Sequence, residues 1–262
     1  MLFVYILIFI FGLIIGSFLN VVVFRLKNNK GFVIGRSHCD NCKHILPWHE
    51  NIPLVSFAFL GGKCSSCKQK ISWQYPLVEL ATGLLFLTAS IIIFRQNLLL
   101  YYSITLLLYY FITISFLIII FIYDLKYYLI LDKVSIPAVI FVLIFKLFIS
   151  WPFLSDYWLL GLSAIIGGGW FALQFYISKG KWVGGGDIRL GILMGLILGW
   201  PGILLALGLS YVGGTVILLP FVLLKKKGMK SQVPFGAFLV PATIIIMFWG
   251  GKIINWYLNK LF

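Results

Sequence analysis

Long runs of apolar residues divide this chain, and most of them are close to the roughly 20 residues that a helix needs to cross a bilayer. We place the runs at 2–24, 77–94, 98–123, 134–150, 158–177, 188–201, 203–224 and 235–250. The sixth run is short and the seventh follows it almost directly, so the boundary between these two is soft. The pattern predicts an all-α polytopic membrane protein with about eight transmembrane helices.

Composition supports the same class of protein. Hydrophobic residues make up 61% of the 262 positions and charged residues only 11%. A soluble globular domain carries about 25% charged residues, so an ordinary soluble fold is excluded. The first apolar run has no basic residues before it and is followed by Arg25 and Lys27, which predicts a retained anchor with its N-terminus outside rather than a cleaved signal.

The basic residues follow the same topology. Of the 21 lysines and arginines, 17 fall in the segments expected inside, at 25–76, 124–133, 178–189 and 225–234. This bias is typical of a positive-inside arrangement, which predicts that these segments face the cytoplasm. The net charge of +14 then reflects topology and contact with anionic lipids. A nucleic-acid role would need a basic surface with stacking aromatics, and the sequence shows none.

The one sizeable polar segment, at 25–76, separates an anchor helix at 1–24 from a membrane domain at 77–262. It holds all four cysteines, as two CxxC pairs with 21 residues between them: Cys39 and Cys42, then Cys64 and Cys67. A domain of this size often needs a metal or disulfides to be stable. Two CxxC pairs at this separation are typical of a tetrahedral zinc site with four thiolate ligands, and the reducing side of the membrane disfavours structural disulfides.

Other interpretations of this segment stay open. The cysteines could form a redox dithiol pair or be chemically inert. The histidines His38, His44 and His49 are interpreted as polar loop residues close to the metal site rather than as ligands, because four thiolates already complete the shell. Glu50 is interpreted as a solvated loop charge.

Two aspartates lie beside apolar runs. Asp124 directly follows the run at 98–123, and Asp187 follows three glycines between two other runs. An ionisable group near hydrocarbon depth is costly and normally faces the helix bundle or a water-filled cavity, where it marks a functional site. The pair therefore predicts acid/base catalysis, although two aspartates that merely end helices remain an alternative. Asp132 is interpreted as a solvated loop residue or a helix cap.

Glycines supply two further patterns. Gly191, Gly195 and Gly199 recur every four residues, which lines one face of the sixth run and predicts close helix packing. The three glycines before Asp187 are different, because they precede a carboxylate and interrupt the apolar pattern. Glycine has unusual freedom of backbone conformation, so these three glycines predict a flexible loop that lies against an extended substrate. The residues of this predicted loop are Gly184, Gly185, Gly186 and Arg189.

Together these residues resemble bacterial type IV prepilin peptidases, the bifunctional leader peptidases and N-methyltransferases of the GxGD membrane aspartyl protease family. The resemblance rests on Gly16, Ser17, Phe18, Leu19, Asn20 and Arg25, the two CxxC pairs, Tyr75, Pro76, Leu77, Val78 and Glu79, Asp124 and Leu125, and Gly184, Gly185, Gly186, Asp187 and Arg189. Two positions depart from the family pattern. Leu131, in Ile130, Leu131 and Asp132, stands where the family usually has the proline of Ile-Pro-Asp or Ile-Pro-Asn, and Gln74 stands where arginine is common.

The resemblance implies a substrate and a second activity. The substrate is a prepilin or pseudopilin with a short basic leader, cut after glycine at the cytoplasmic surface of the membrane by Asp124 and Asp187. The new N-terminal residue is then methylated with S-adenosylmethionine as the donor. No dinucleotide-type GxGxxG motif is visible, so this second activity rests on the resemblance. Glu79 and Asn20 are the residues we assign to it.

The residues themselves leave other functions open. Two close carboxyls repel each other and share a proton, which supplies an acid and a base for the attack of water on a peptide bond. A proton- or cation-coupled transporter would also use intramembrane carboxylates and glycine-broken helices. A membrane scaffold with a zinc-organised docking surface is a third possibility. The sequence does not say whether the substrates serve pili, protein secretion or DNA uptake.

Overall fold

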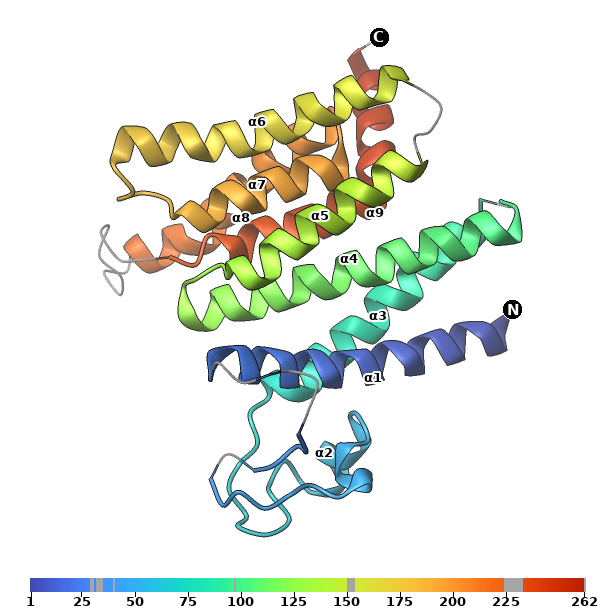
Figure 1. Cartoon of the computed structure of the whole chain (residues 1–262), viewed down its shortest axis with the longest axis vertical. Helices are drawn as coiled ribbons and strands as arrows, with labels where there is room; N and C mark the ends of the chain where they lie inside the picture. Colours follow the sequence, from blue (N-terminus) through green and yellow to red (C-terminus); the bar gives the residue numbers. More distant parts are fainter. Residues whose placement is uncertain are drawn as a thin grey trace. The chain divides into compact units, whose positions relative to one another are not determined.

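The computed structural model describes residues 1–28, 31, 35–39, 41–96, 98–149, 154–223 and 233–261. Within these ranges the chain is helical and has no β-strand longer than an isolated bridge (Figure 1). The helices are α1 (Leu2–Lys27), α2 (Val55–Phe59), α3 (Gln74–Phe94), α4 (Leu100–Tyr127), α5 (Asp132–Ile149), α6 (Leu154–Ser178), α7 (Gly185–Leu198), α8 (Gly202–Leu223) and α9 (Gly236–Leu261), with a 3-10 turn, η1 (Trp48–Asn51). The predicted all-α class is confirmed.

Each of the eight apolar runs forms a helix, but these helices differ in their capacity to cross a bilayer. Among the described residues, six are long and apolar enough: α1, α3, α4, α6, α8 and α9. Helix α7 has 14 residues, about 21 Å at 1.5 Å per residue, which is shorter than a hydrocarbon core of about 30 Å. Helix α5 begins with Asp132 and Lys133 and carries Lys146 in its last turn. The count of eight spans is therefore approximate.

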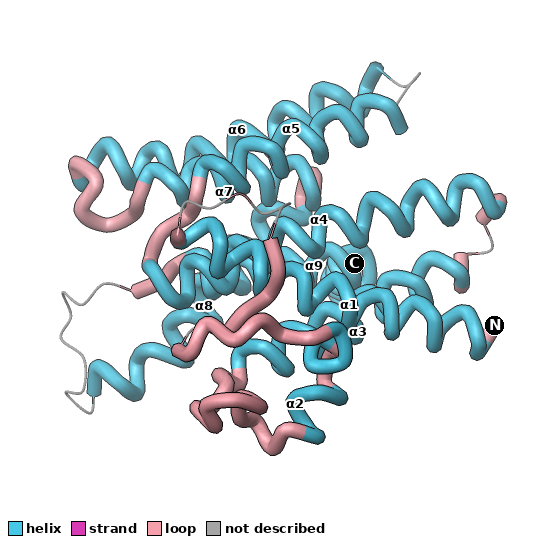
Figure 2. The backbone as a smooth tube through the Cα atoms, turned by 60° about the horizontal axis from the view of Figure 1, so that its bottom comes forward, coloured by secondary structure: helices cyan, strands magenta, loops and turns pink. Residues whose placement is uncertain are grey.

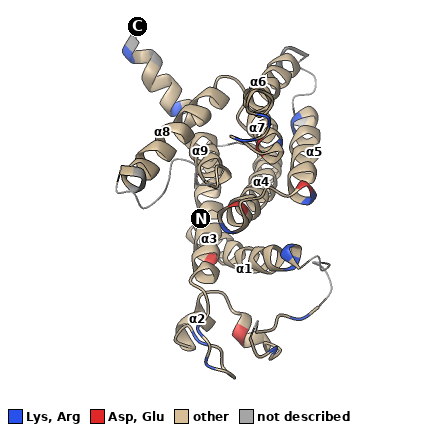
Figure 3. Ribbon diagram, turned by 90° about the vertical axis from the view of Figure 1, so that its left-hand side faces the viewer, with Lys and Arg blue, Asp and Glu red and all other residues tan. Residues whose placement is uncertain are grey.

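The long helices are apolar on most of their circumference. Leu7, Ile14 and Phe18 of α1 are exposed, which in a bilayer places them against lipid. Lysines and arginines lie mainly near helix ends and in the connections, and leave long uncharged stretches along the helices (Figure 3). Helices satisfy their own backbone hydrogen bonds, so such sequences are stable in hydrocarbon. The chain is a multi-pass membrane protein.

The chain forms two compact units, Met1–Ile119 and Ile120–Phe262. In the first unit, α1 packs closely against α3 (Figure 1). The crossing depends on glycine, because a Cβ atom on Gly12 would lie 2.7 Å from the Cα of Gly83, and one on Gly16 would lie 2.7 Å from the Cα of Glu79. Close backbone approach of this kind is typical of helix pairs in membranes. It brings Glu79 of α3 next to α1.

Between α1 and α3 the chain forms a mostly non-helical segment, seen as pink tube in Figure 2. We call residues 35–72, as far as they are described, the loop segment. It contains η1, α2 and two short hairpins, each marked by one bridge: His38 with Ile45, and Lys63 with Lys70. Each hairpin carries one CxxC pair.

In the second unit, α7 packs most extensively against α6. A Cβ atom on Gly191 would collide with the carbonyl of Gly167, and one on Gly195 would lie 2.8 Å from the Cα of Ala164. The predicted packing face of α7 is confirmed for these two glycines. Gly199 has a different role, because no atom lies within 4 Å of its Cβ position and its φ of 65° ends the helix.

Candidate active site and metal centre

Asp124 lies near the end of α4 and is buried, with 4% of its side chain exposed. Its Oδ2 accepts a hydrogen bond of 3.0 Å from the backbone N–H of Ala237, in the first turn of α9. A Cβ atom on the preceding residue, Gly236, would lie 2.9 Å from the same oxygen. The first backbone N–H groups of a helix have no partner within it and favour an anionic acceptor. The start of α9 therefore positions one oxygen of Asp124.

Asp187 lies in the first turn of α7 and is also buried, with 9% exposed. Its Oδ2 accepts a hydrogen bond of 2.8 Å from the backbone N–H of Gly184, while its own N–H donates to the Gly184 carbonyl over 3.1 Å. This reciprocal pair resembles a capping box, with the backbone carbonyl of Gly184 in place of an N-cap side chain, and it fixes the carboxyl relative to the helix start. Asp187 thus has one oxygen held by the backbone, as Asp124 does.

A direct contact joins the segments that carry the two aspartates. A Cβ atom on Gly186, the residue before Asp187, would lie 2.7 Å from the Cβ of Ile130, which follows α4. Glycine at this position is therefore needed for the chain to approach so closely. The two carboxyls are close enough for the charge on Asp187 to act on Asp124. Two carboxyls that interact closely ionise less readily together, and such a pair can supply an acid and a base.

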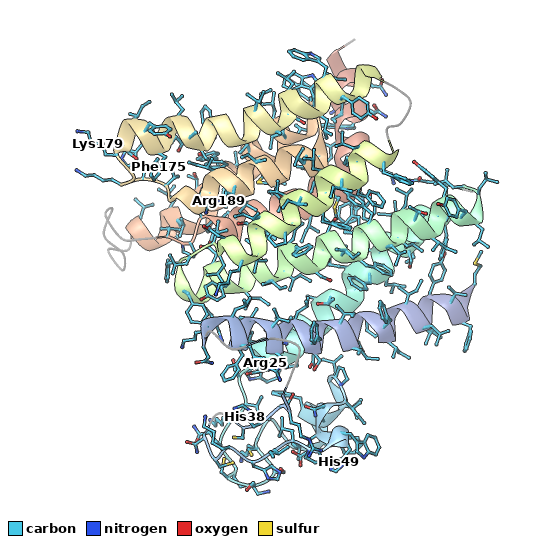
Figure 4. The ribbon with its side chains drawn as sticks, in the orientation of Figure 1. Arg25, His38, His49, Phe175, Lys179 and Arg189 are labelled. Atoms are coloured by element: carbon cyan, nitrogen blue, oxygen red, sulfur yellow. The ribbon has the colours of Figure 1, made fainter. Side chains whose placement is uncertain are left out.

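The predicted loop at 184–186 is the start of a helix. Gly184 is the N-cap residue, whereas Gly185, Gly186 and Arg189 lie in α7. The capping box explains this difference, because it satisfies the first backbone groups of α7 and stabilises a helical start. Arg189 on α7 (Figure 4) forms an ion pair with Asp132, the first residue of α5. Asp132 therefore lies at the start of a helix and not in a loop, and its exposed side chain is ion-paired.

The four cysteines lie together. Their sulfur atoms are all within 4.8 Å of one another, with 3.8 Å between the Sγ atoms of Cys39 and Cys67 and 4.0 Å between those of Cys42 and Cys64. None forms a disulfide. The cluster fits a tetrahedral metal site, since four thiolates at such spacing can all reach one ion. No histidine joins this cluster among the described residues.

The two hairpins that supply the cysteines have the same local geometry. In the first, the N–H of Lys43 donates to the Cys39 carbonyl and Lys43 has a φ of 59°. In the second, the N–H of Lys68 donates to the Cys64 carbonyl and Lys68 also has a φ of 59°. Backbone N–H donation from Gln69 lowers the pKa of the Cys67 thiol to about 6. Although the backbone N–H of Cys42 lowers it, the pKa of the Cys39 thiol is raised to about 11 by burial and the neighbouring Cys42 and Cys64 thiols, so Cys67 ionises first.

Asn20 and Glu79 lie at the crossing of α1 and α3, and both are buried. The Asn20 side chain donates to the Tyr75 carbonyl over 3.2 Å and accepts from the Gln74 amide over 3.0 Å. The Glu79 Oε2 accepts a 2.9 Å hydrogen bond from the backbone N–H of Leu54, whose φ is 60°. Both residues line a cavity of about 540 Å³ within the first unit.

Comparisons with known proteins show which family the chain belongs to. Residues 10–93 match the bacterial peptidase A24 N-terminal domain, and residues 111–219 match the type IV leader peptidase family. A protein of Aeromonas salmonicida is 31% identical over 97% of this chain and 94% of its own length, and one of Bacillus subtilis is 31% identical over 97% of both chains. The chain belongs to the type IV leader peptidase family.

A third relative within this leader peptidase family, from Pseudomonas aeruginosa, is 33% identical over 95% of this chain and 91% of its own length. All three relatives bear the name prepilin leader peptidase/N-methyltransferase. No solved structure matches the chain. Nothing in the comparisons supports the transporter alternative.

Two features of this leader peptidase fold escaped the sequence analysis. The start of α9 holds Asp124, and its sequence signal is the Pro234, Phe235, Gly236 turn before the last apolar run. Glu50, interpreted from the sequence as a solvated loop charge, instead lines the cavity that contains Asn20 and Glu79. The turn before the last span was visible in the sequence. The hydrogen bond that Ala237, just after this turn, donates to Asp124 was not, because the two residues are 113 positions apart.

Replacing Gly236 with alanine is expected to lower leader cleavage about 10- to 100-fold, because the new Cβ would press on the Asp124 carboxyl, and small misplacements of reacting groups have effects of this size. Alanine is the better helix former, so α9 itself should not be weakened. Initial rates of prepilin cleavage by membranes with equal enzyme content measure the effect. Gly251→Ala is the control, since Gly251 is also in α9 and has no atom within 4 Å of its Cβ position. Equal rates for both variants would contradict the positioning of Asp124 by α9.

Proposed function

We propose that this chain is a membrane-embedded aspartic endopeptidase that removes the basic leader from type IV prepilins and pseudopilins, with Asp124 and Asp187 as its catalytic pair. The observation that supports it best is the arrangement of the two buried carboxyls, each with one oxygen held by a backbone N–H at the start of a helix. Asp124 and Asp187 lie in one compact unit, and the contact between Gly186 and Ile130 joins their segments.

The chemistry follows from two carboxyls and one water molecule. The ionised carboxyl accepts a proton from water as the water oxygen attacks the scissile carbonyl. The protonated carboxyl donates its proton to the scissile carbonyl oxygen. When the tetrahedral species collapses, the C–N bond breaks, the nitrogen takes the proton that the other carboxyl accepted from water, and a hydroxyl proton returns to the first carboxyl. The leader leaves as a carboxylic acid and the mature pilin as an amine. The pair exchanges protons as a unit, so the roles belong to the dyad and not to one residue.

The glycine-rich start of α7 suits an extended substrate. Among the described residues, no atom lies within 4 Å of the position that a Cβ atom would occupy on Gly185. A peptide backbone could therefore approach this face next to Asp187. Gly184, Gly186 and Arg189 complete the proposed substrate-binding residues, and Arg189 also forms an exposed ion pair with Asp132. In this proposal the protein lies in the cytoplasmic membrane of a bacterium, and its active site faces the cytoplasm.

The second activity, N-methylation of the new N-terminal residue, is proposed to use the cavity that Asn20 and Glu79 line. S-adenosylmethionine, when bound there, would supply an electrophilic methyl group on a sulfonium. The residues present fit such a ligand, because the cavity combines the Glu79 carboxyl with the side chains of Arg25 and Arg36. A cationic sulfonium and an anionic amino-acid carboxylate each find an opposite charge in this lining.

The four-cysteine cluster is proposed to hold a structural zinc ion within a cytoplasmic domain at 25–76. Four thiolates favour zinc over the harder divalent cations, and a closed shell of four protein ligands is typical of a structural site. Cys39 and Cys64 also line the cavity of Asn20 and Glu79. The proposed role of the metal is therefore to fix the cavity wall.

Co-expression with candidate prepilins tests the proposed function directly. Leader removal is read as a mobility shift on a gel, and mass spectrometry of the product identifies the new N-terminus and its methylation. Loss of the leader and a mass increase of one methyl group are expected. An intact precursor with every prepilin tested, despite normal insertion of the enzyme, would contradict the proposal.

Replacing Glu79 with glutamine is expected to lower methyl transfer at least tenfold while leaving most cleavage intact. The amide can still accept the hydrogen bond from Leu54, so the packing is retained and only the negative charge is lost. Mass spectrometry of the processed pilin gives the methylated and unmethylated fractions in one sample. Equal loss of both activities would mean that the two sites are shared or that the fold has collapsed.

A further inference from the structure

The cavity of about 540 Å³ contains a second carboxylate besides Glu79. It lies between the ends of α1 and α3 and the loop segment, and Glu50 of η1 contributes to its lining. Figure 4 shows Arg25 at the end of α1 and His38 in the loop segment, two further residues of this lining. Only seven acidic residues occur in the whole chain. Two of them in one cavity therefore call for a chemical explanation.

The two carboxyls differ in how they are held. Glu79 is 7% exposed and accepts a hydrogen bond from the N–H of Leu54. Glu50 has an oxygen, Oε2, that is buried and has no hydrogen-bond partner among the described residues. A buried carboxylate oxygen without a partner costs free energy, so such an atom is normally satisfied by an ordered water, an ion or a ligand. Glu79 is anchored by the protein, whereas the Oε2 of Glu50 is an acceptor that the described residues leave unused.

The ligands of the proposed methyl transfer supply two cationic groups. One is the sulfonium of the donor, and the other is the α-ammonium of the newly exposed N-terminus. A fixed anion suits the sulfonium, which has no hydrogen to donate. A carboxylate with an unused oxygen suits the ammonium, which has three N–H donors. The difference between Glu79 and Glu50 matches this difference between the two cations.

We propose that the cavity binds the cleaved pilin's N-terminus as well as the methyl donor, and that Glu50 is the catalytic residue that receives its α-amine. This inference rests on the proposed methyltransferase function. Glu50 accepts a hydrogen bond from the α-ammonium and then takes one proton from it. The nitrogen lone pair attacks the methyl carbon, a C–N bond forms and the C–S bond breaks. The donor leaves as a neutral thioether, the product is a methylated ammonium, and the Glu50 proton passes to solvent.

The experiment measures binding of the amine apart from turnover. Purified full-length enzyme with S-adenosylhomocysteine is titrated with a synthetic peptide of a mature pilin N-terminus, and with the same peptide N-acetylated. Wild-type enzyme is expected to bind the free-amine peptide about tenfold more tightly, as for a hydrogen bond between charged groups. Glu50→Gln is expected to lose this preference, and Glu50→Asp to retain part of it. His49→Ala, next in the chain but outside the cavity lining, should behave as wild type.

Kinetics with S-adenosylmethionine separate the two carboxyls. Glu50→Gln should lower the kcat of methyl transfer with an unchanged KM for the donor, and it should keep leader cleavage and metal content. A Glu50→Gln enzyme that still prefers the free amine, or that loses donor affinity instead, would overturn the role of Glu50. If the wild-type enzyme transfers no methyl group to the free-amine peptide, the proposed methyltransferase function fails and this inference falls with it.

Discussion

Asparagine in place of Asp124 or Asp187 is expected to reduce leader cleavage at least a thousandfold, and the double substitution is expected to be little worse than either single one. The reason is that one carboxyl must accept a proton while the other donates one, so the loss of either disables the pair, and residues that act as a unit show non-additive effects. Cleavage of a co-expressed prepilin, followed over time on a gel, gives the rate for each variant.

The same substitutions should leave the protein folded. Asparagine keeps the side-chain oxygen that accepts from Ala237 or Gly184, and it removes a buried negative charge whose neighbour is also acidic. Membrane insertion and metal content are therefore expected to match the wild type. Asp132→Asn serves as the control, because the side chains of its ion pair with Arg189 are 55% and 38% exposed, and exposed pairs contribute only about 0–1 kcal/mol.

A different outcome would redirect the assignment. If Asp187→Asn still released the leader at near the wild-type rate, the catalytic pair would be wrong. The transporter alternative would then be tested by measuring ion flux into vesicles that contain the protein. If both aspartate variants processed pilin normally, the aspartates would only end helices, and the scaffold interpretation would regain support.

Serine in place of Cys64 is expected to lower bound zinc from about one ion per chain to a small fraction of that, and to abolish methyl transfer. Structural zinc contributes roughly 10–16 kcal/mol in small zinc-binding peptides, so a domain with little core depends on it. Cys64 is buried and lines the proposed methyl-transfer cavity, which would lose one wall. Metal analysis of purified protein and mass spectrometry of processed pilin measure the two effects.

The zinc prediction has a control in the same turn. Ser66 lies between Cys64 and Cys67 and is exposed, so Ser66→Ala should keep both zinc and methylation. Cleavage by Cys64→Ser should fall much less than methylation, because Asp124 and Asp187 lie outside the loop segment. Purified wild-type protein without zinc, or cysteines joined by disulfides in freshly isolated membranes, would count against the metal site.

The sequence by itself determined the class of protein and the identity of the chemical groups. Apolar runs of membrane length predicted the helices, because hydrocarbon leaves the backbone few alternatives to a helix. Two CxxC pairs predicted the cysteine cluster, because each hairpin is closed by hydrogen bonds between residues four or five positions apart, such as Lys43 with Cys39 and Cys39 with His44. Interactions of this range are encoded in a few adjacent residues.

Only the tertiary structure decided how these groups are held. The hydrogen bond from Ala237 to Asp124, the contact of Gly186 with Ile130 and the place of Glu50 in the cavity join segments far apart in the chain. Apolar runs do not specify which helix packs against which, since that choice depends on shape at glycines such as Gly12 and Gly191. The start of α7 likewise depended on a capping box that the three glycines did not predict. A one-dimensional pattern records which residues are small or apolar, whereas packing in three dimensions decides which of them meet.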